Sequence, residues 1–322
     1  MNGELLQVKD LRVYYHTEAG PVKAVDGVSL SLGRGARLGL VGESGCGKST
    51  LAMTLLRLIK SPGRIESGQV LLEGLDLVQL PEDKMRQVRL GQISLIPQGA
   101  MNSLNPVMRV KDQIMDGMKD HSEKMSQAEL ETRVYEALDS VELERGVANM
   151  YPHELSGGMK QRVCVAIAIS LRPKIIVADE PTSALDVVIQ RQVMETIERL
   201  QSALGISMIL IGHDMGLMAQ SVERLAVMYA GRLVEVGRVE DIFSEPLHPY
   251  TLLLISTLPV LEAKGTFKGI PGITPSLLNA PANCLFHPRC PQAKDICAQE
   301  VPALIEARPA RWVACHLDEV QR

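Results

Sequence analysis

The feature that most constrains the fold of this chain is a glycine-rich segment between a predicted strand and a predicted helix. Gly42–Thr50 reads GESGCGKST and matches G-x-x-x-x-G-K-S/T, with the apolar run Leu38–Val41 before it and a helical pattern over Ser49–Ile59 after it. Glycines let successive backbone N–H groups turn toward phosphate oxygens, and the next helix N-terminus faces the same anion. A chance glycine-rich turn is the alternative, but the flanking strand and helix are the context that the motif requires. This segment, called the phosphate loop below, predicts a nucleoside triphosphate site.

The side chains of the phosphate loop have separate predicted roles. Lys48 supplies a positive charge to the terminal phosphates, and the hydroxyl of Ser49 is expected to bind Mg²⁺. The other loop residues expected to line the nucleotide are Gly42, Ser44, Gly45, Cys46, Gly47 and Thr50.

An acidic pair at the end of a buried strand completes the predicted catalytic set. The strand covers Lys174–Asp179 (KIIVAD), and Glu180 follows it directly. A phosphate loop needs an acid for its metal ion, so Asp179 is expected to hold Mg²⁺ through water. Glu180 is then placed to orient or deprotonate the attacking water. Helix capping is the alternative, but two carboxylates that end an apolar strand in such a chain favour hydrolysis.

The hydrophobic pattern around these motifs predicts an α/β fold. Two apolar runs, 174–179 and 206–211, predict buried strands, and an amphipathic helix is predicted between them over 187–204. Buried strands separated by helices are typical of a parallel sheet. Alternating segments near the N-terminus predict an additional antiparallel layer; they cover 5–15, 22–32 and 69–73.

Two further regions differ from this core. Residues 100–165 contain helical segments at 110–118 and 127–140 and no predicted strand, which indicates a helical insert. After Arg238 prolines become frequent, and apart from a short predicted helix over 249–258 the tail is expected to be loop-rich.

The composition excludes several classes of function. The 34 lysines and arginines are balanced by 38 acids, so no basic field exists to hold nucleic acid or anionic lipid. No apolar run approaches the roughly 18–20 residues of a membrane span, and the N-terminus lacks the pattern of a signal peptide. We therefore expect a cytosolic protein that binds no nucleic acid.

A further motif carries a family resemblance. Leu155–Arg162 (LSGGMKQR) resembles the signature sequence of ATP-binding-cassette (ABC) ATPases, and the acidic strand follows it at the family's spacing. The resemblance covers roughly residues 5–240 and implies the α/β fold of phosphate-loop ABC ATPases: a RecA-like core, an antiparallel β layer, a helical insert and here a loop-rich C-terminal extension. Ser156, Gly157 and Gly158 open a helix, so they form a second anion-binding helix end. The family implies a head-to-tail dimer, with each ATP between the phosphate loop of one subunit and the signature of the other.

The resemblance implies roles for further residues. Gln98 resembles the glutamine that touches Mg²⁺ and water and couples to the membrane partner, and Asp186 ends a loop (Ser183–Asp186) that resembles the dimer contact. His213 resembles the switch histidine that contacts the γ-phosphate, with a surface histidine as the alternative. Tyr15 is the predicted residue that stacks on adenine; Tyr14 and an ordinary strand tyrosine remain alternatives.

The tail resembles the C-terminal extension of oligopeptide and dipeptide importer ATPases. The resemblance rests on Leu247–Leu252 (LHPYTL) and Gly272–Leu277 (GITPSL), and Gly63–Gly68 with Val22–Gly27 resembles the D-type of their two ATPase subunits. It implies an ATP hydrolase that powers import of di- or oligopeptides. Oligosaccharide and nickel importers share the extension, so these substrates stay open; a soluble, non-transport ABC ATPase is the alternative from another class.

Four cysteines of the tail are predicted metal ligands. Cys284, Cys290, Cys297 and Cys315 lie in a proline-rich segment with few aliphatic residues, where an inorganic cross-link would aid folding. Some relatives carry an iron–sulfur cluster at matching cysteines, so the expectation is a 4Fe–4S cluster, then zinc, then free thiols.

The family resemblance also implies an assembly. The expected partners are two transmembrane permease subunits, a second and non-identical ABC ATPase subunit and, indirectly, an extracytoplasmic substrate-binding protein. The expected location is peripheral, on the cytoplasmic face of the bacterial inner membrane. Residues 1–240 form the predicted nucleotide-binding domain, with its insert at about 100–165, and residues 241–322 form the predicted extension.

Overall fold

The chain divides into two compact units. The structure, a computed structural model, describes residues 4–121, 125–183, 185–258, 269–278 and 280–317. The first unit comprises Gly33–Ala36 and Gln79–Ile209, and the second comprises Glu4–Leu32, Arg37–Val78 and Leu210–Arg322. The phosphate loop and the C-terminal tail thus belong to the same unit.

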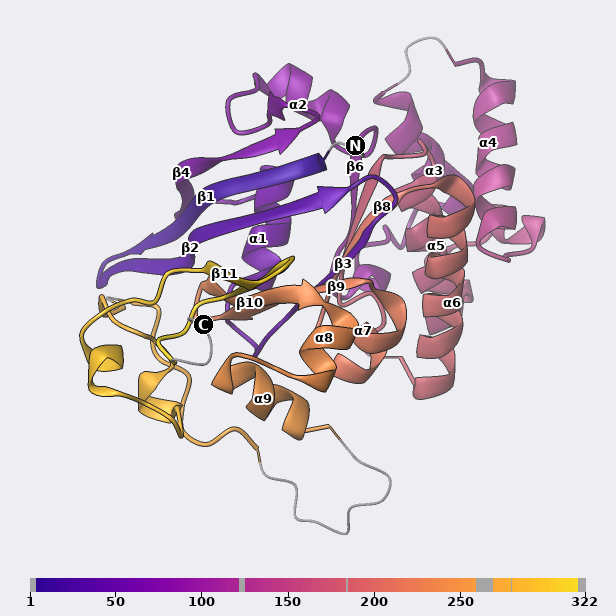
Figure 1. Ribbon diagram of the computed structural model, residues 1–322. Helices are drawn as coiled ribbons and strands as arrows, with labels where there is room; N and C mark the ends of the chain where they lie inside the picture. Colours follow the sequence, from indigo (N-terminus) through magenta and orange to yellow (C-terminus); the bar gives the residue numbers. More distant parts are fainter. Residues whose placement is uncertain (1–3, 122–124, 184, 259–268, 279, 318–322) are drawn as a thin grey trace. The chain divides into compact units, whose positions relative to one another are not determined.

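An antiparallel layer forms one part of the second unit (Figure 1). Its strand order is β2-β1-β4-β5, and β1 pairs with β4 in antiparallel register, for example Val8 opposite Val70. Alternate residues of β1, among them Leu11 and Val13, are buried, as expected of a sheet with one face on the core. The predicted antiparallel layer is confirmed. The strands are β1 (Glu4–Thr17), β2 (Gly20–Gly33), β4 (Gly63–Leu72) and β5 (Leu75–Asp76).

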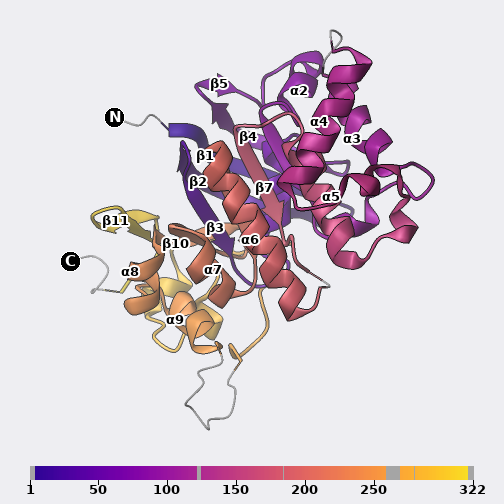
Figure 2. The same cartoon turned by 90° about the vertical axis from the view of Figure 1, so that its right-hand side faces the viewer.

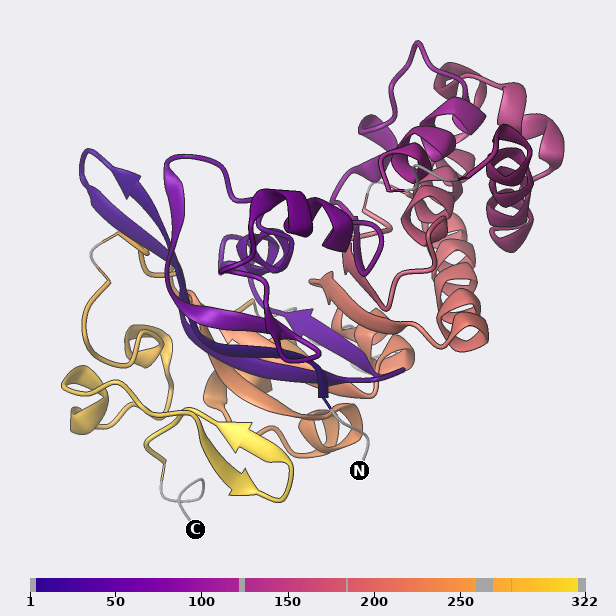
Figure 3. The same ribbon diagram turned by 90° about the horizontal axis from the view of Figure 1, so that it is seen from above.

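A second run of strands in this unit has the order β11-β12-β10-β9-β3. Strand β3 is parallel to β9, whereas β9, β10, β12 and β11 pair antiparallel in turn. The strands are β3 (Arg37–Val41), β9 (Arg224–Tyr229), β10 (Arg232–Arg238), β11 (Ile305–Arg308) and β12 (Arg311–Val313), and the helices are α1 (Lys48–Leu55), α7 (Met215–Ser221), α8 (Val239–Ser244) and α9 (Pro249–Ser256). The β11–β12 hairpin, yellow in Figure 3, lies in the tail that was expected to be loop-rich. Its strands are too short to give a period-2 pattern in the sequence.

The first unit contains the helical insert and the acidic strand. Strands β6 (Ile93–Ile96) and β7 (Ile175–Asp179) pair in parallel, with Ile93 opposite Ile175. Helices α3, α4 and α5 pack on one another (Figure 2). Their bounds, with those of the neighbouring helices, are α2 (Glu82–Val88), α3 (Val110–Lys119), α4 (Gln127–Ser140), α5 (Gly157–Ile169) and α6 (Val187–Leu204), and β8 (Ser207–Gly212) leads from this unit to the other. No strand interrupts the described part of 100–165, which confirms the insert.

The described helices are too short or too polar for a membrane span. Within the ranges given above, none combines the length and the hydropathy that a bilayer crossing needs.

Candidate nucleotide site

The phosphate loop joins β3 to α1 and follows a path that glycine makes possible. Gly42, Gly45 and Gly47 have φ of 152°, 76° and 107°, a region that other residues rarely adopt. A Cβ on Gly42 would lie 2.1 Å from the carbonyl oxygen of Met228, and one on Gly47 would lie 2.0 Å from that of Ala24. The glycines of the motif therefore fit a loop that is pressed against neighbouring backbone.

Lys48 is held inside this loop. Its Nζ donates to the carbonyl oxygens of Gly42 at 2.7 Å and Glu43 at 3.0 Å, and the residue is 6% exposed. Ser49, which follows it, is exposed together with Ser44 at the loop tip. The loop thus offers a buried positive charge and, beside it, an accessible hydroxyl.

Cys46 has a structural place in the loop. The residue is fully buried, and burial raises the pKa of its thiol above the ordinary value, which the charge of Lys48 only partly offsets. Its backbone N–H donates to the carbonyl oxygen of Glu43 at 3.2 Å. The side chain fills space within the loop as a neutral thiol.

Glu43 is the loop residue that sequence reasoning missed. Its side chain accepts hydrogen bonds from Arg289 and Thr274, and its backbone N–H donates to the hydroxyl of Tyr250 at 2.9 Å. All three partners belong to the C-terminal extension. They lie more than 200 positions away along the chain, so no local spacing could have indicated them.

The two candidate adenine-stacking residues lie side by side in β1 with different surroundings. The hydroxyl of Tyr14 donates to Asp26 at 2.7 Å, and burial together with this carboxylate raises the pKa of Tyr14 to about 12. Tyr15 is part-exposed, and a Cβ on Gly63 would lie 2.7 Å from its ring. Tyr14 is therefore fixed by a polar contact, and Tyr15 stays the prediction for the adenine.

The first unit brings together Gln98 and Glu180. Gln98 follows β6 and Glu180 follows β7, and because these strands are parallel neighbours their ends meet. Gln98 Nε2 donates to Glu180 Oε2 at 2.8 Å. Asp179, the last residue of β7, is 5% exposed. The two predicted catalytic residues of this unit are thus in direct contact.

The signature segment forms a helix start, as predicted. Ser156 is the N-cap of α5 and its Oγ accepts the N–H of Met159 at 3.3 Å. Ser156 and Gly157 are exposed, so the N-terminal end of this helix faces outward. A Cβ on Gly158 would lie 2.9 Å from a methyl group of Ile189, which explains a small residue there.

Asp186 and His213 occupy element boundaries. Asp186 caps α6 by accepting the N–H groups of Val188 and Ile189 at 3.1 and 3.0 Å. Ala184, in the predicted dimer-contacting loop, lies outside the described residues. His213 is exposed directly after β8, so the sequence placed it correctly at a strand end.

Comparisons with known proteins identify the family of this chain. Residues 25–183 match the family "ABC transporter", and residues 234–297 match "Oligopeptide/dipeptide transporter, C-terminal region". The chain is 45% identical to the oligopeptide transport ATP-binding protein OppD of Escherichia coli (strain K12), over 97% of this chain and 92% of the relative. The chain belongs to the ABC transporter ATP-binding proteins. This ABC ATPase is also 42% identical to the dipeptide transport ATP-binding protein DppD of Caldanaerobacter subterraneus subsp. tengcongensis, over 99% of this chain and 98% of the relative.

Solved structures support the same assignment. The ABC ATPase matches MJ0796, described as a dimeric bacterial ABC transporter cassette, with a TM-score of 0.65 and 28% identity over 73% of this chain and 98% of that one. The same cassette has been solved as a dimer in a post-hydrolysis state with ADP and phosphate, with a TM-score of 0.65 and 27% identity. The predicted phosphate-loop ABC ATPase fold and ATP hydrolase activity are confirmed.

The prediction of an iron–sulfur cluster is wrong, and the zinc alternative has no support either. Among the described residues, which include all four tail cysteines, no group of three or more His, Cys, Asp and Glu side chains is arranged to hold a metal ion. The cysteines are free, and burial raises the pKa of three of the thiols, that of Cys315 to about 11. The relatives' names, OppD and DppD transport ATP-binding proteins, mention no such cluster.

The extension is held instead by aromatic packing. Phe286, 2% exposed, contacts the rings of Tyr229, Tyr250 and His248 with centroids 5.2 to 5.7 Å apart. A buried ion pair between Arg311 and Glu235, at 2.8 Å, adds a second attachment to β10. The sequence argument failed because it counted aliphatic residues and overlooked the area that a few aromatic rings bury.

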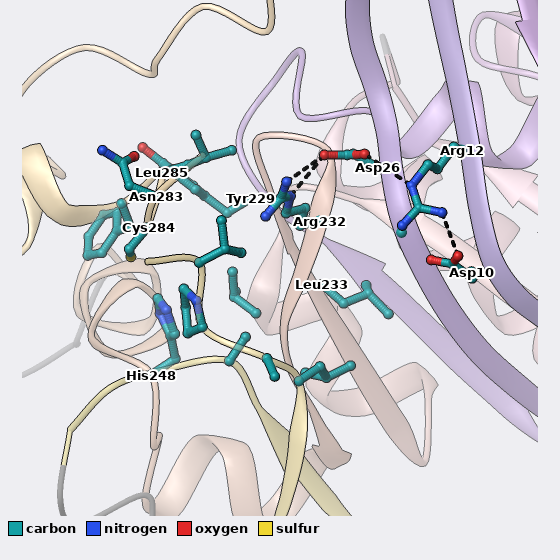
Figure 4. Close-up of a pocket in the computed structure, with 18 residues that line it drawn as sticks. Asp10, Arg12, Asp26, Tyr229, Arg232, Leu233, His248, Asn283, Cys284 and Leu285 are labelled. Carbon is teal, nitrogen blue, oxygen red and sulfur yellow. Dashed lines mark hydrogen bonds and ion pairs between the residues drawn. The ribbon is translucent and has the colours of Figure 1, made fainter. Parts of the chain in front are cut away.

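A cavity of about 440 Å³ lies beside this aromatic group (Figure 4). One wall carries Arg12, Asp26 and Arg232, and Asp26 accepts from Arg232 Nη2 at 2.6 Å. The opposite wall includes Cys284 and Leu285 of the extension. The charged groups of this first wall pair with one another, since Arg12 Nε also lies 3.5 Å from Asp26 Oδ1.

Proposed function

We propose that this chain is the ATP-hydrolysing subunit of an importer for di- or oligopeptides. The observation that carries the proposal is the full-length similarity to oligopeptide and dipeptide transport ATP-binding proteins, which includes the C-terminal region that names that family. The formed phosphate loop with its buried Lys48 supports an intact ATP site.

The proposed site assigns a task to each cluster of residues. The phosphate loop binds the triphosphate through backbone N–H groups and Lys48, and Tyr15 stacks on the adenine. Ser49, Gln98 and Asp179 are the proposed residues for Mg²⁺, which would neutralise charge on the phosphates.

Glu180 is the proposed base for the attacking water. The hydrogen bond from Gln98 Nε2 to Glu180 Oε2, at 2.8 Å, orients the carboxylate that would accept the water proton. His213 is the proposed contact for the γ-phosphate, and its place directly after a strand supports this role.

The proposed assembly follows the same relatives. Ser156, Gly157, Gly158 and Asp186 would face the phosphate loop of a second, non-identical ATPase subunit, and the exposed helix start at Ser156 supports such a contact. The pair would act on two transmembrane permeases from the cytoplasmic face of the membrane as peripheral subunits. The division into residues 1–240 and 241–322 stays a prediction.

Replacing Glu180 tests the catalytic assignment. The variant Glu180→Gln is expected to bind ATP normally but to hydrolyse it at least about 100-fold more slowly, because the amide cannot take a proton from water. ATP hydrolysis and ATP binding are measured on the same preparation. Glu195→Gln, an exposed residue of α6, is the matched control and should keep full turnover. Normal turnover in Glu180→Gln would exclude the assigned role.

Purification from native membranes tests the transport assignment. Mass spectrometry of a tagged chain from detergent-solubilised membranes should find two polytopic permeases and a second ATPase. Uptake of a labelled dipeptide and tripeptide should stop in cells that carry Lys48→Ala. Partners without permeases, or unchanged peptide uptake, would overturn the proposal.

A further inference from the structure

One arginine of the extension binds the phosphate loop directly. Arg289 Nη1 donates to Glu43 Oε2 at 2.7 Å, and Nη2 donates to Oε1 at 2.9 Å. The arginine side chain is 4% exposed and that of Glu43 is 25% exposed. Paired, charge-assisted hydrogen bonds of this kind fix both distance and orientation, and water competes little with a pair so well covered.

The guanidinium group of Arg289 is held in place by further hydrogen bonds. Nε donates to the carbonyl oxygen of Pro271 at 2.8 Å, and Nη1 also donates to the hydroxyl of Tyr229 at 3.2 Å. Nη2 lies 3.4 Å from the carbonyl oxygen of Ile270. An arginine with acceptors on all its edges cannot move without losing several of them. The extension therefore presents a fixed positive charge to the loop.

Glu43 receives contacts at its backbone and its side chain. Its N–H donates to Tyr250, its carboxylate accepts from Arg289 and from Thr274 Oγ1 at 3.1 Å, and its carbonyl oxygen accepts from Lys48 at 3.0 Å. Glu43 is thus bound by the extension and is also one of the two residues whose carbonyl oxygens accept hydrogen bonds from the Lys48 ammonium. Within the described part of the chain, Glu43 is the loop residue whose side chain forms hydrogen bonds to the extension.

The charges of Glu43, Arg289 and Lys48 explain why the contact between the extension and the loop affects an anionic ligand. Hydrogen bonds from Arg289 lower the pKa of the Glu43 carboxyl against the opposing effect of burial, and the charge of Lys48 acts in the same direction as Arg289. Glu43 is consequently a carboxylate, and Arg289 balances its charge. Without that balance the carboxylate would attract the Lys48 ammonium and repel a triphosphate.

We propose that Arg289 is a positioning residue of the nucleotide site, through which the C-terminal extension holds the carboxylate of Glu43 away from the Lys48 ammonium and so sets the affinity for ATP. The inference rests on the proposed ATP site at the phosphate loop. It gives the extension a direct effect on the nucleotide site of its own subunit.

The affinity of the full-length chain for ATP, measured with a fluorescent ATP analogue, tests this inference. Arg289→Met should raise the Kd about tenfold, because the uncompensated carboxylate remains beside Lys48. Glu43→Gln alone should lower the Kd, because the charge of Arg289 is then no longer offset by a carboxylate beside Lys48. The double variant Glu43→Gln/Arg289→Met should return to within about threefold of the wild-type Kd.

The double variant separates a charge effect from a folding effect. If Arg289 served stability alone, the affinity for ATP would stay low in the double variant, because the hydrogen bonds of the arginine would still be missing. That result would overturn the inference. The double variant also keeps the test decisive where Arg289→Met fails to fold, since it leaves no unpaired charge at the buried site.

Two further variants complete the experiment. Arg308 forms a two-bond ion pair with Glu245 in the same extension, so Arg308→Met removes the same group elsewhere and should leave the Kd unchanged. Lys48→Ala should abolish binding; if it does not, the proposed ATP site itself fails. If Lys48→Ala abolishes binding while Arg289→Met binds as wild type, only the positioning role is excluded.

Discussion

At the scale of single residues, the glycines of the phosphate loop differ in whether an added Cβ atom would clash with neighbouring backbone. Gly45 and Gly47 both have positive φ, but their surroundings differ. A Cβ on Gly45 meets nothing within 4 Å, whereas one on Gly47 would lie 2.0 Å from backbone oxygen. Alanine at Gly45 would therefore cost free energy through the unfavourable φ alone, whereas alanine at Gly47 would add a steric clash.

This difference predicts unequal effects of alanine at the two positions. Gly47→Ala is expected to lower the free energy of unfolding by roughly 3 kcal/mol or more, since backbone must shift. Gly45→Ala should cost about 1 kcal/mol from the unfavourable φ alone. Denaturant unfolding of both variants measures the difference. Equal losses would mean that the clash at Gly47 relaxes freely.

How much of the site could be predicted depended on whether its residues are close in sequence. The loop over Gly42–Thr50 carries its own local pattern, and the end of β7 is marked by an apolar run before two acids. The contact between Glu43 and Arg289 has no such pattern, because only the folded chain brings them together. Long-range pairs of this kind leave no periodicity to read.

At the scale of elements, the start of α9 contains a histidine that the fold keeps neutral. His248 is 2% exposed, its Nδ1 accepts the N–H of Tyr250 at 3.0 Å, and burial lowers its pKa to about 3. The unfolded chain takes up a proton near pH 6.5, whereas the folded chain does not until about pH 3. The stability of this element must therefore fall as the pH falls between these values.

The pH dependence can be assigned with one variant. The melting temperature of the wild type should drop between pH 7.5 and pH 5, with up to about 1.4 kcal/mol lost per pH unit below the unfolded pKa. His248→Asn keeps an acceptor for the Tyr250 N–H and should show a smaller drop, although it is less stable at pH 7.5. His153→Asn, at an exposed position, serves as control. An unchanged slope in His248→Asn would contradict the assignment.

Elements were predicted well where they are long. Helix α6 matches its predicted bounds, Val187–Leu204, because its apolar stripe continues over many turns. Strands β11 and β12 were missed because four and three residues cannot display alternation. The expected cluster of cysteines was wrong because Phe286 and the rings around it supply the core that the tail was thought to lack.

At the scale of the whole molecule, metal removal should separate catalysis from folding. Chelation with EDTA is expected to stop ATP hydrolysis, since phosphoryl transfer depends on Mg²⁺, and added Mg²⁺ should restore it. The melting temperature of the chain without nucleotide should not change, because the described residues, among them the tail cysteines, form no metal-binding group. Elemental analysis should find iron and zinc well below one atom per chain. A loss of stability on chelation would contradict this prediction.

The pairing of β12 with β10 has a further consequence. Glu235 and Val236 of β10 lie opposite Val313 and Trp312, so the tail covers backbone that would otherwise face solvent as an open sheet edge. Open edges recruit strands from other molecules, and short, charged strands discourage this. The outermost strand here, β11, has four residues and exposes Glu306 and Arg308. The extension therefore covers the β10 edge of the sheet and opposes aggregation there. A chain cut after β10 would tend to polymerise through the exposed β10 edge.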